Sequence, residues 1–170
     1  MPGFQRRGLV TALAVGTGLG MRAALAAPPM LKMADIQKEG DVACLYHCDF
    51  ADERRFSQML DNIRNHLEAY NFDPLALRIV IVAHAGGIRF FLTDLVGTPW
   101  EKDVVNKDIF GRMAALGGYG VQGLLCAVTF AKNKISQDRA RAEPWLRMVP
   151  SGVATVGALQ GKGFAYIKIG

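Results

Sequence analysis

Cysteine and histidine are scarce in this sequence, and most motifs that report a particular chemistry are missing. The 170 residues include three cysteines and three histidines. They contain no Ser-His-Asp order, paired-carboxylate motif, nucleotide-binding loop or established zinc-ligand spacing. Internal repeats and low-complexity tracts are also absent. These absences argue against a triad hydrolase, a nucleotide-binding protein and a zinc finger.

A hydrophobic run long enough to cross a membrane is missing too. The uncharged run Gly8–Met21 has 14 residues, short of the roughly 20 that span a bilayer. It follows the pair Arg6-Arg7 and precedes the small-residue site Ala24-Leu25-Ala26, which is the layout of a secretory signal. The two arginines fit the twin-arginine route. We therefore predict an export signal in residues 1–26, cleaved after about Ala26, and a periplasmic protein that is free of the membrane after cleavage.

The net positive charge is small once this signal is set aside. The net charge of +5 comes from 20 basic and 15 acidic residues. Residues 1–26 hold three arginines and no acid, so the remainder has 17 minus 15, or +2. This balance does not favour a nucleic-acid partner. We expect a leader or linker over residues 27–40 and a single domain over residues 41–170.

Apolar patterns along the domain alternate between those of strands and helices. The expected strands are Asp41–Cys48, Leu77–Ala83, Val121–Cys126, Met148–Pro150 and Phe164–Lys168. The expected helices are Glu53–Tyr70, Ile88–Leu95, Lys102–Leu116, Thr129–Ile135, a segment within Gln137–Arg147, and Gly152–Gln160 with Ser151 as N-cap. This alternation predicts an α/β fold in which helices cover both faces of a parallel sheet of about five strands.

Four reactive side chains fall where the expected strands end. His47 and Cys48 end the first strand, His84 follows the second, and Cys126 ends the third. Right-handed crossovers place all these ends along one edge of the sheet. Since side chains alternate between faces, at most one of His47 and Cys48 should meet Cys126. A Cys48–Cys126 disulfide is conceivable if their strands are neighbours.

Cys126 is the residue best placed for chemistry. Ligands and reactive groups collect at the carboxyl ends of parallel strands, and a helix start that follows favours a thiolate. An odd number of cysteines in an exported protein also leaves at least one thiol free. The alternative is a small buried apolar residue. We expect Cys44 to be inert core, His66 to be hydrogen-bonded to the framework, and Gly86-Gly87 to form a tight turn.

Several short blocks resemble the DsrE/DsrF-like sulfur-metabolism proteins, in the branch of small exported members. They are Leu45-Tyr46-His47, Asn62–Leu67, Ile81–His84, Leu125-Cys126 with Thr129, Val149–Ala154, and Leu159–Lys168. The resemblance covers about residues 41–170. It implies a flavodoxin-like three-layer sandwich, a homo-oligomer, and a cysteine at position 126 that carries sulfane sulfur to or from partner proteins.

Three functional hypotheses follow. In the first, Cys126 accepts sulfane sulfur from a donor protein or small polysulfide, His84 orients it or moves a proton, and no cofactor is needed. In the second, a binding module holds a soft metal through His84, Cys126 and one of His47 or Cys48. In the third, the chain is a structural or interaction subunit, and its cysteines belong to the core.

Overall fold

Five parallel strands form the centre of the computed structural model, which describes residues 26–170. The predicted export signal thus lies outside the described residues except for Ala26. The strands are β1 (Val42–Cys48), β2 (Leu77–Ala83), β3 (Gln122–Cys126), β4 (Leu146–Val149) and β5 (Ala165–Lys168). Their order is β4-β3-β2-β1-β5, and every neighbouring pair is parallel. The predicted α/β fold with a parallel sheet of five strands is confirmed.

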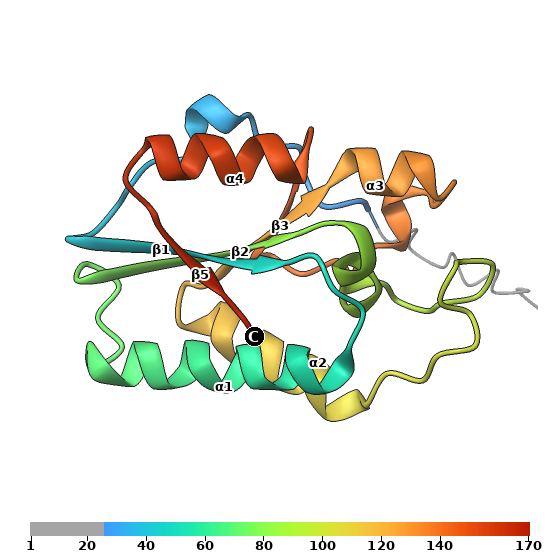
Figure 1. Cartoon of the computed structure of the whole chain (residues 1–170), viewed down its shortest axis with the longest axis horizontal. Helices are drawn as coiled ribbons and strands as arrows, with labels where there is room; N and C mark the ends of the chain where they lie inside the picture. Colours follow the sequence, from blue (N-terminus) through green and yellow to red (C-terminus); the bar gives the residue numbers. More distant parts are fainter. Residues whose placement is uncertain (1–25) are drawn as a thin grey trace, which may run out of the picture.

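Helices cover both faces of this sheet, so the molecule has three layers (Figure 1). Helices α1 (Glu53–Ala69) and α2 (Lys107–Gly118) pack on one face, where they close the larger apolar core. Helix α4 (Gly152–Gly161) lies across β1, β2 and β3 on the other face. The three-layer, flavodoxin-like arrangement that the resemblance implied is therefore present. A sheet covered on both faces explains why β2 is apolar along almost its whole length.

Local sequence signals account for the ends of these helices. Asp52 caps α1, since its carboxylate accepts a hydrogen bond of 2.7 Å from the Arg55 amide. The chain leaves α1 through Asn71, whose φ of 53° lies in the left-handed region that asparagine tolerates. Ser151 caps α4 as predicted, with its hydroxyl accepting from the Ala154 amide at 3.4 Å.

Four predicted helices differ from the observed structure. Helix α2 begins at Lys107 instead of Lys102, because the Asn106 side chain caps it by accepting from the Asp108 amide. The segment 137–147 holds only the 3-10 turn η3 (Gln137–Arg139), since the chain must extend into β4 from Leu146. The segment after β2 is the 3-10 helix η2 (Ala85–Phe91), and α3 (Ala127–Lys132) begins directly after Cys126.

The segment expected as a leader is packed against the domain. Met30 forms a parallel bridge with Met148, which protects the outer edge of β4. The 3-10 turn η1 (Met33–Asp35) follows, and Ile36 is buried in the core under α4. The Lys162 ammonium donates to the carbonyls of Met33 and Ile36 at 2.8 and 2.6 Å. Residues 29–36 thus form part of the folded unit.

The direction of the chain across the sheet reverses at β4. From β1 to β4 each strand is added on the same side, and α4 then carries the chain back to β5 beside β1. In open α/β sheets, ligands collect outside the carboxyl ends of strands at the point where the strand order reverses, which here lies between β1 and β5. In the described part of the chain, no helix has the length and apolarity to cross a bilayer.

Candidate functional site

His47, His84 and Cys126 lie on the same face of the sheet, the one that α4 covers. Their alternating neighbours Leu45, Val82 and Leu124 belong to the core under α4. Ala83 pairs with Leu125, so extending this register by one residue places His84 beside Cys126. The sequence prediction that only one of His47 and Cys48 shares a face with Cys126 is confirmed, and that residue is His47.

Cys48 lies on the opposite face and takes no part in this group. It is fully buried in the core under α1 and α2, together with Cys44. All three cysteines are free, and the conceivable Cys48–Cys126 disulfide is not formed, because β2 separates the two strands. Burial raises the pKa of both Cys44 and Cys48 above the ordinary value, so both remain neutral thiols at neutral pH.

Cys126 differs from the other two cysteines because it lines an open cavity. It is the N-terminal cap residue of α3, and its own surface is 4% exposed. The cavity has a volume of about 580 Å³ and lies between α3, the start of α4 and the turn after β2. The cavity therefore lies at the carboxyl ends of β2 and β3, beside the start of α4. This is the position at which the sequence placed a reactive thiol.

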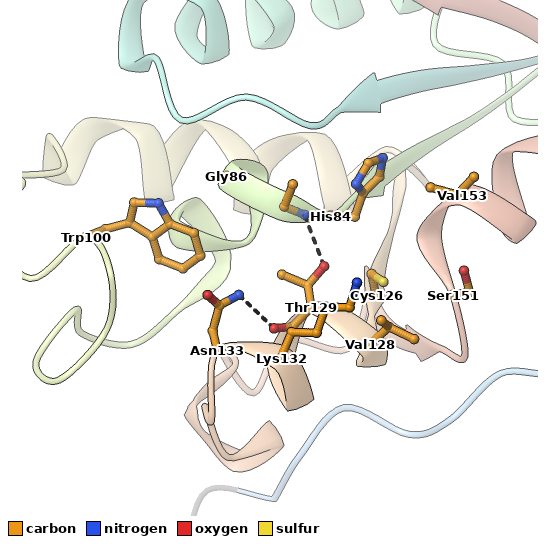
Figure 2. Close-up of a pocket in the computed structure, with 11 residues that line it drawn as sticks. His84, Gly86, Trp100, Cys126, Val128, Thr129, Lys132, Asn133, Ser151 and Val153 are labelled. Atoms are coloured by element: carbon orange, nitrogen blue, oxygen red, sulfur yellow. Dashed lines mark hydrogen bonds between the residues drawn. The ribbon is translucent and has the colours of Figure 1, made fainter.

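Polar side chains surround the thiol in this cavity. His84, Ser151 and Lys132 line it, and Figure 2 shows them grouped around Cys126, with Trp100 at the far end. The Lys132 side chain brings an ammonium group, which suits an anionic ligand. The sequence analysis named His84 and Cys126, but it missed Lys132 and Trp100. Trp100 could not be predicted from the sequence, because it reaches the cavity from the long loop between η2 and α2.

Hydrogen bonds hold the wall of the cavity in place. The Ala85 amide donates to the Thr129 hydroxyl at 3.1 Å, and the Asn133 side-chain amide donates to the Thr129 carbonyl at 2.8 Å (Figure 2). The first of these bonds ties the turn after β2 to α3. It therefore fixes the spacing between the two elements that carry His84 and Cys126.

His84 also joins a second polar group, formed with residues of β1 and β5. Its Nε2 lies 2.6 Å from Nε2 of His47, and Nδ1 of His47 lies 2.7 Å from the Tyr166 hydroxyl. Burial lowers the pKa of both histidines, while Asp49 partly opposes the shift. Both imidazoles are therefore mainly neutral at pH 7, so each has one nitrogen with a free lone pair.

Asp49 completes this second group. Ligand atoms of His47, Asp49 and His84 all lie within 4.8 Å of one another, and among residues 26–170 no other three such side chains meet in this way. The sequence analysis missed Asp49, although its place directly after the end of β1 was a signal. It also missed Tyr166, because the sequence does not reveal that β5 lies beside β1. The predicted metal set of His84, Cys126 and one of His47 or Cys48 is not assembled.

The remaining sequence expectations concern His66 and the two glycines. His66 is half-buried, and its Nδ1 is hydrogen-bonded to the Tyr46 hydroxyl at 3.0 Å, as expected for a framework histidine. Gly86 and Gly87 allow the turn after β2 to approach β1 closely. A Cβ at Gly87 would lie only 2.1 Å from the carbonyl oxygen of Cys48. Both glycines are required for space, and neither has a positive φ.

Comparisons with known proteins support the fold. No protein-family model matches the chain, and no curated protein matches it either. A solved structure is similar to it, that of MTH1491 from Methanobacterium thermoautotrophicum, which is described as a protein of unknown function. The two are 25% identical with a TM-score of 0.60, over 75% of this chain and 99% of that one. This similarity extends to nearly the whole of the other protein and assigns no activity.

Proposed function

We propose that this chain is a sulfur-handling protein that carries or transfers sulfane sulfur as a persulfide on Cys126. The observation that carries the proposal is the contrast among the three cysteines. Cys126 lines a cavity at the carboxyl edge of the sheet that also holds several polar side chains, whereas Cys44 and Cys48 are enclosed in the apolar core. A carrier needs one reachable thiol. Because Cys44 and Cys48 are enclosed in the core, they cannot form a disulfide with Cys126.

The chemistry requires only groups that line the cavity. Neutral His84 takes the proton of the Cys126 thiol, and the thiolate attacks the outer sulfur of a donor persulfide, R–S–SH. A new S–S bond forms on Cys126 while the donor's S–S bond breaks, and the donor leaves as R–S⁻ with the bonding electrons. The proton on His84 then passes to this thiolate. Sulfur arrives already oxidised, so no external oxidant and no cofactor are needed.

The surroundings of Cys126 favour an anionic product. A persulfide ionises more readily than a thiol, and the Lys132 ammonium lines the same cavity. Val128 and Val153, which are 42% and 69% exposed, flank the opening and leave an apolar rim. Such a rim suits a sulfur donor or acceptor protein, and the open cavity also admits a small polysulfide. We place this function in the periplasm and in a homo-oligomer, on the basis of the sequence.

Uptake of labelled sulfane sulfur tests this proposal. The reduced protein is incubated with labelled polysulfide, freed of excess reagent and treated with cyanide, which removes sulfane sulfur as thiocyanate. We expect one cyanide-labile sulfur per chain in the wild type and none in Cys126→Ser. Cys44→Ala is the matched control, because it removes a cysteine that faces the core, and it should take up sulfur like the wild type. Equal uptake by Cys126→Ser and the wild type would refute the mechanism.

A further inference from the structure

We propose that His47, His84 and Asp49 form a binding site for one divalent transition-metal ion, on the β1 side of the cavity that holds Cys126. This inference goes beyond sulfur handling and does not depend on it. The donor atoms are two imidazole nitrogens and a carboxylate oxygen. This set suits a borderline ion such as Zn²⁺ or Fe²⁺ and differs from the thiolate-rich sets that select soft ions.

The first argument is the convergence of the donors. The two Nε2 atoms lie 2.6 Å apart, and all three ligand atoms fit within 4.8 Å. Two nitrogens bound to one ion by bonds of about 2.0–2.1 Å lie roughly 3 Å apart. A small rotation of either ring widens the observed contact to that separation. The ion would replace the proton that the two Nε2 atoms share, and Asp49 supplies a negative charge.

The second argument is the support behind the ligands. The Tyr166 hydroxyl contacts Nδ1 of His47, which leaves Nε2 to face His84. An outer hydrogen bond of this kind orients a metal-binding histidine and fixes its tautomer. The ring of His84 packs on the first residue of α4, since a Cβ at Gly152 would lie 2.8 Å from Cβ of His84. Both rings are therefore held close to the positions that binding requires.

The third argument is access. Both histidines are half-buried and Asp49 is exposed, so an ion can enter from solvent and keep positions for water or another ligand. Arg55 lies near enough to His47 for its positive charge to lower the pKa of that histidine. The same charge would repel a cation bound nearby. The Arg55 guanidinium is turned towards the Ile169 carbonyl and the Phe50 ring.

Zinc titration of the metal-free, full-length mature protein tests the site. We expect one Zn²⁺ per chain by calorimetry and by elemental analysis after gel filtration. His47→Gln, His84→Gln and Asp49→Asn should each weaken binding by at least tenfold. Tyr166→Phe, which keeps the packing, should weaken it by about tenfold through the lost outer hydrogen bond. The melting temperature of each metal-free variant is measured first, so that unfolding is not mistaken for loss of a ligand.

His66→Gln is the matched control, because His66 is also a half-buried histidine paired with a tyrosine hydroxyl but lies outside the group. It should bind zinc like the wild type. Cys126→Ser should also retain zinc, and the Co²⁺ complex should lack a thiolate charge-transfer band. Absence of one-to-one binding, or equal loss in His66→Gln and His47→Gln, would overturn the proposal. A thiolate band that Cys126→Ser abolishes would overturn it too.

An ion bound to His84 would occupy the lone pair that takes the Cys126 proton, so sulfur uptake is measured on the metal-free protein. Under that condition the two proposals fail separately. Asp49→Asn should lose zinc but take up sulfane sulfur normally, whereas Cys126→Ser should lose sulfur and keep zinc. Sulfur uptake without zinc binding would reject the metal site alone. Zinc binding without sulfur uptake would reject the carrier function alone.

Discussion

The close approach of the turn after β2 to the end of β1 allows a quantitative prediction at Gly87. An alanine Cβ there would lie 2.1 Å from the Cys48 carbonyl oxygen and 2.7 Å from its Sγ. Ordinary contacts begin near 3.4 Å, so the backbone would have to separate by about 1.3 Å, the difference between 3.4 and 2.1 Å. The carbonyl cannot move alone, because it accepts a hydrogen bond of 3.0 Å from the His84 amide.

Gly87→Ala should therefore be strongly destabilising. Overpacking costs about 1–3 kcal/mol, and contact with a central strand places this site at the upper end, about 3 kcal/mol. For a domain of this size, each kcal/mol shifts the melting temperature by roughly 2–4 °C, which gives a loss of roughly 6–12 °C. Circular dichroism during heating and in urea measures both quantities.

Gly111→Ala provides the control for this experiment. Gly111 lies within α2, and no atom outside its own helix would come within 4 Å of an added Cβ. Alanine should raise the stability there by about 0.5–1 kcal/mol, because glycine is unfavourable inside a helix. If Gly87→Ala were as stable as Gly111→Ala, the packing of the turn against β1 would be wrong.

Three further predictions concern pH, an ion pair and thiol reactivity. Burial lowers the pKa of His66 beside Tyr46 below 6.5, so its contribution to stability is complete above that pH and is lost as the pH falls from 6.5 through the lower pKa of the folded state. In urea unfolding below pH 6.5, His66→Gln should then depend less on pH than the wild type, and an unchanged slope would contradict this. Asp103→Asn should lower the free energy of unfolding by about 1–3 kcal/mol, because buried Arg89 loses a charged partner at 2.7 Å. A change near zero would show that this ion pair does not stabilise the fold. Iodoacetamide should modify only Cys126 in the native protein, and Cys44 and Cys48 should react only after unfolding in urea; peptide mass spectrometry identifies the modified residues. Modification of Cys44 or Cys48 in the native protein would contradict their burial in the core.

Much of the fold could be predicted from local patterns. The apolar run Leu77–Ala83 matches β2 at both ends, and the helical periodicity locates α1 closely. The secondary-structure prediction was wrong where local patterns compete with tertiary contacts. Residues 137–147 have a helical composition, yet the chain extends there to reach the outer edge of the sheet.

The candidate site was predictable only in part. Strand alternation correctly placed His47 and Cys48 on opposite faces without saying which of them accompanies Cys126, and the odd cysteine count drew attention to a free thiol. The contact of His47 with Tyr166 depends on β5 returning beside β1, a long-range pairing that no local pattern encodes. Asp49 joins the two histidines for a similar reason, since its role depends on the position of His84 on the neighbouring strand.

Intact-mass spectrometry tests the central claim, that Cys126 carries sulfane sulfur, most directly. The mature protein is purified without reductant, measured before and after polysulfide, and digested to locate any added sulfur. The account predicts a gain of one or more sulfur atoms on the peptide that contains Cys126, and no gain in Cys126→Ser. An unchanged mass in the wild type, or a gain that Cys126→Ser retains, would contradict it.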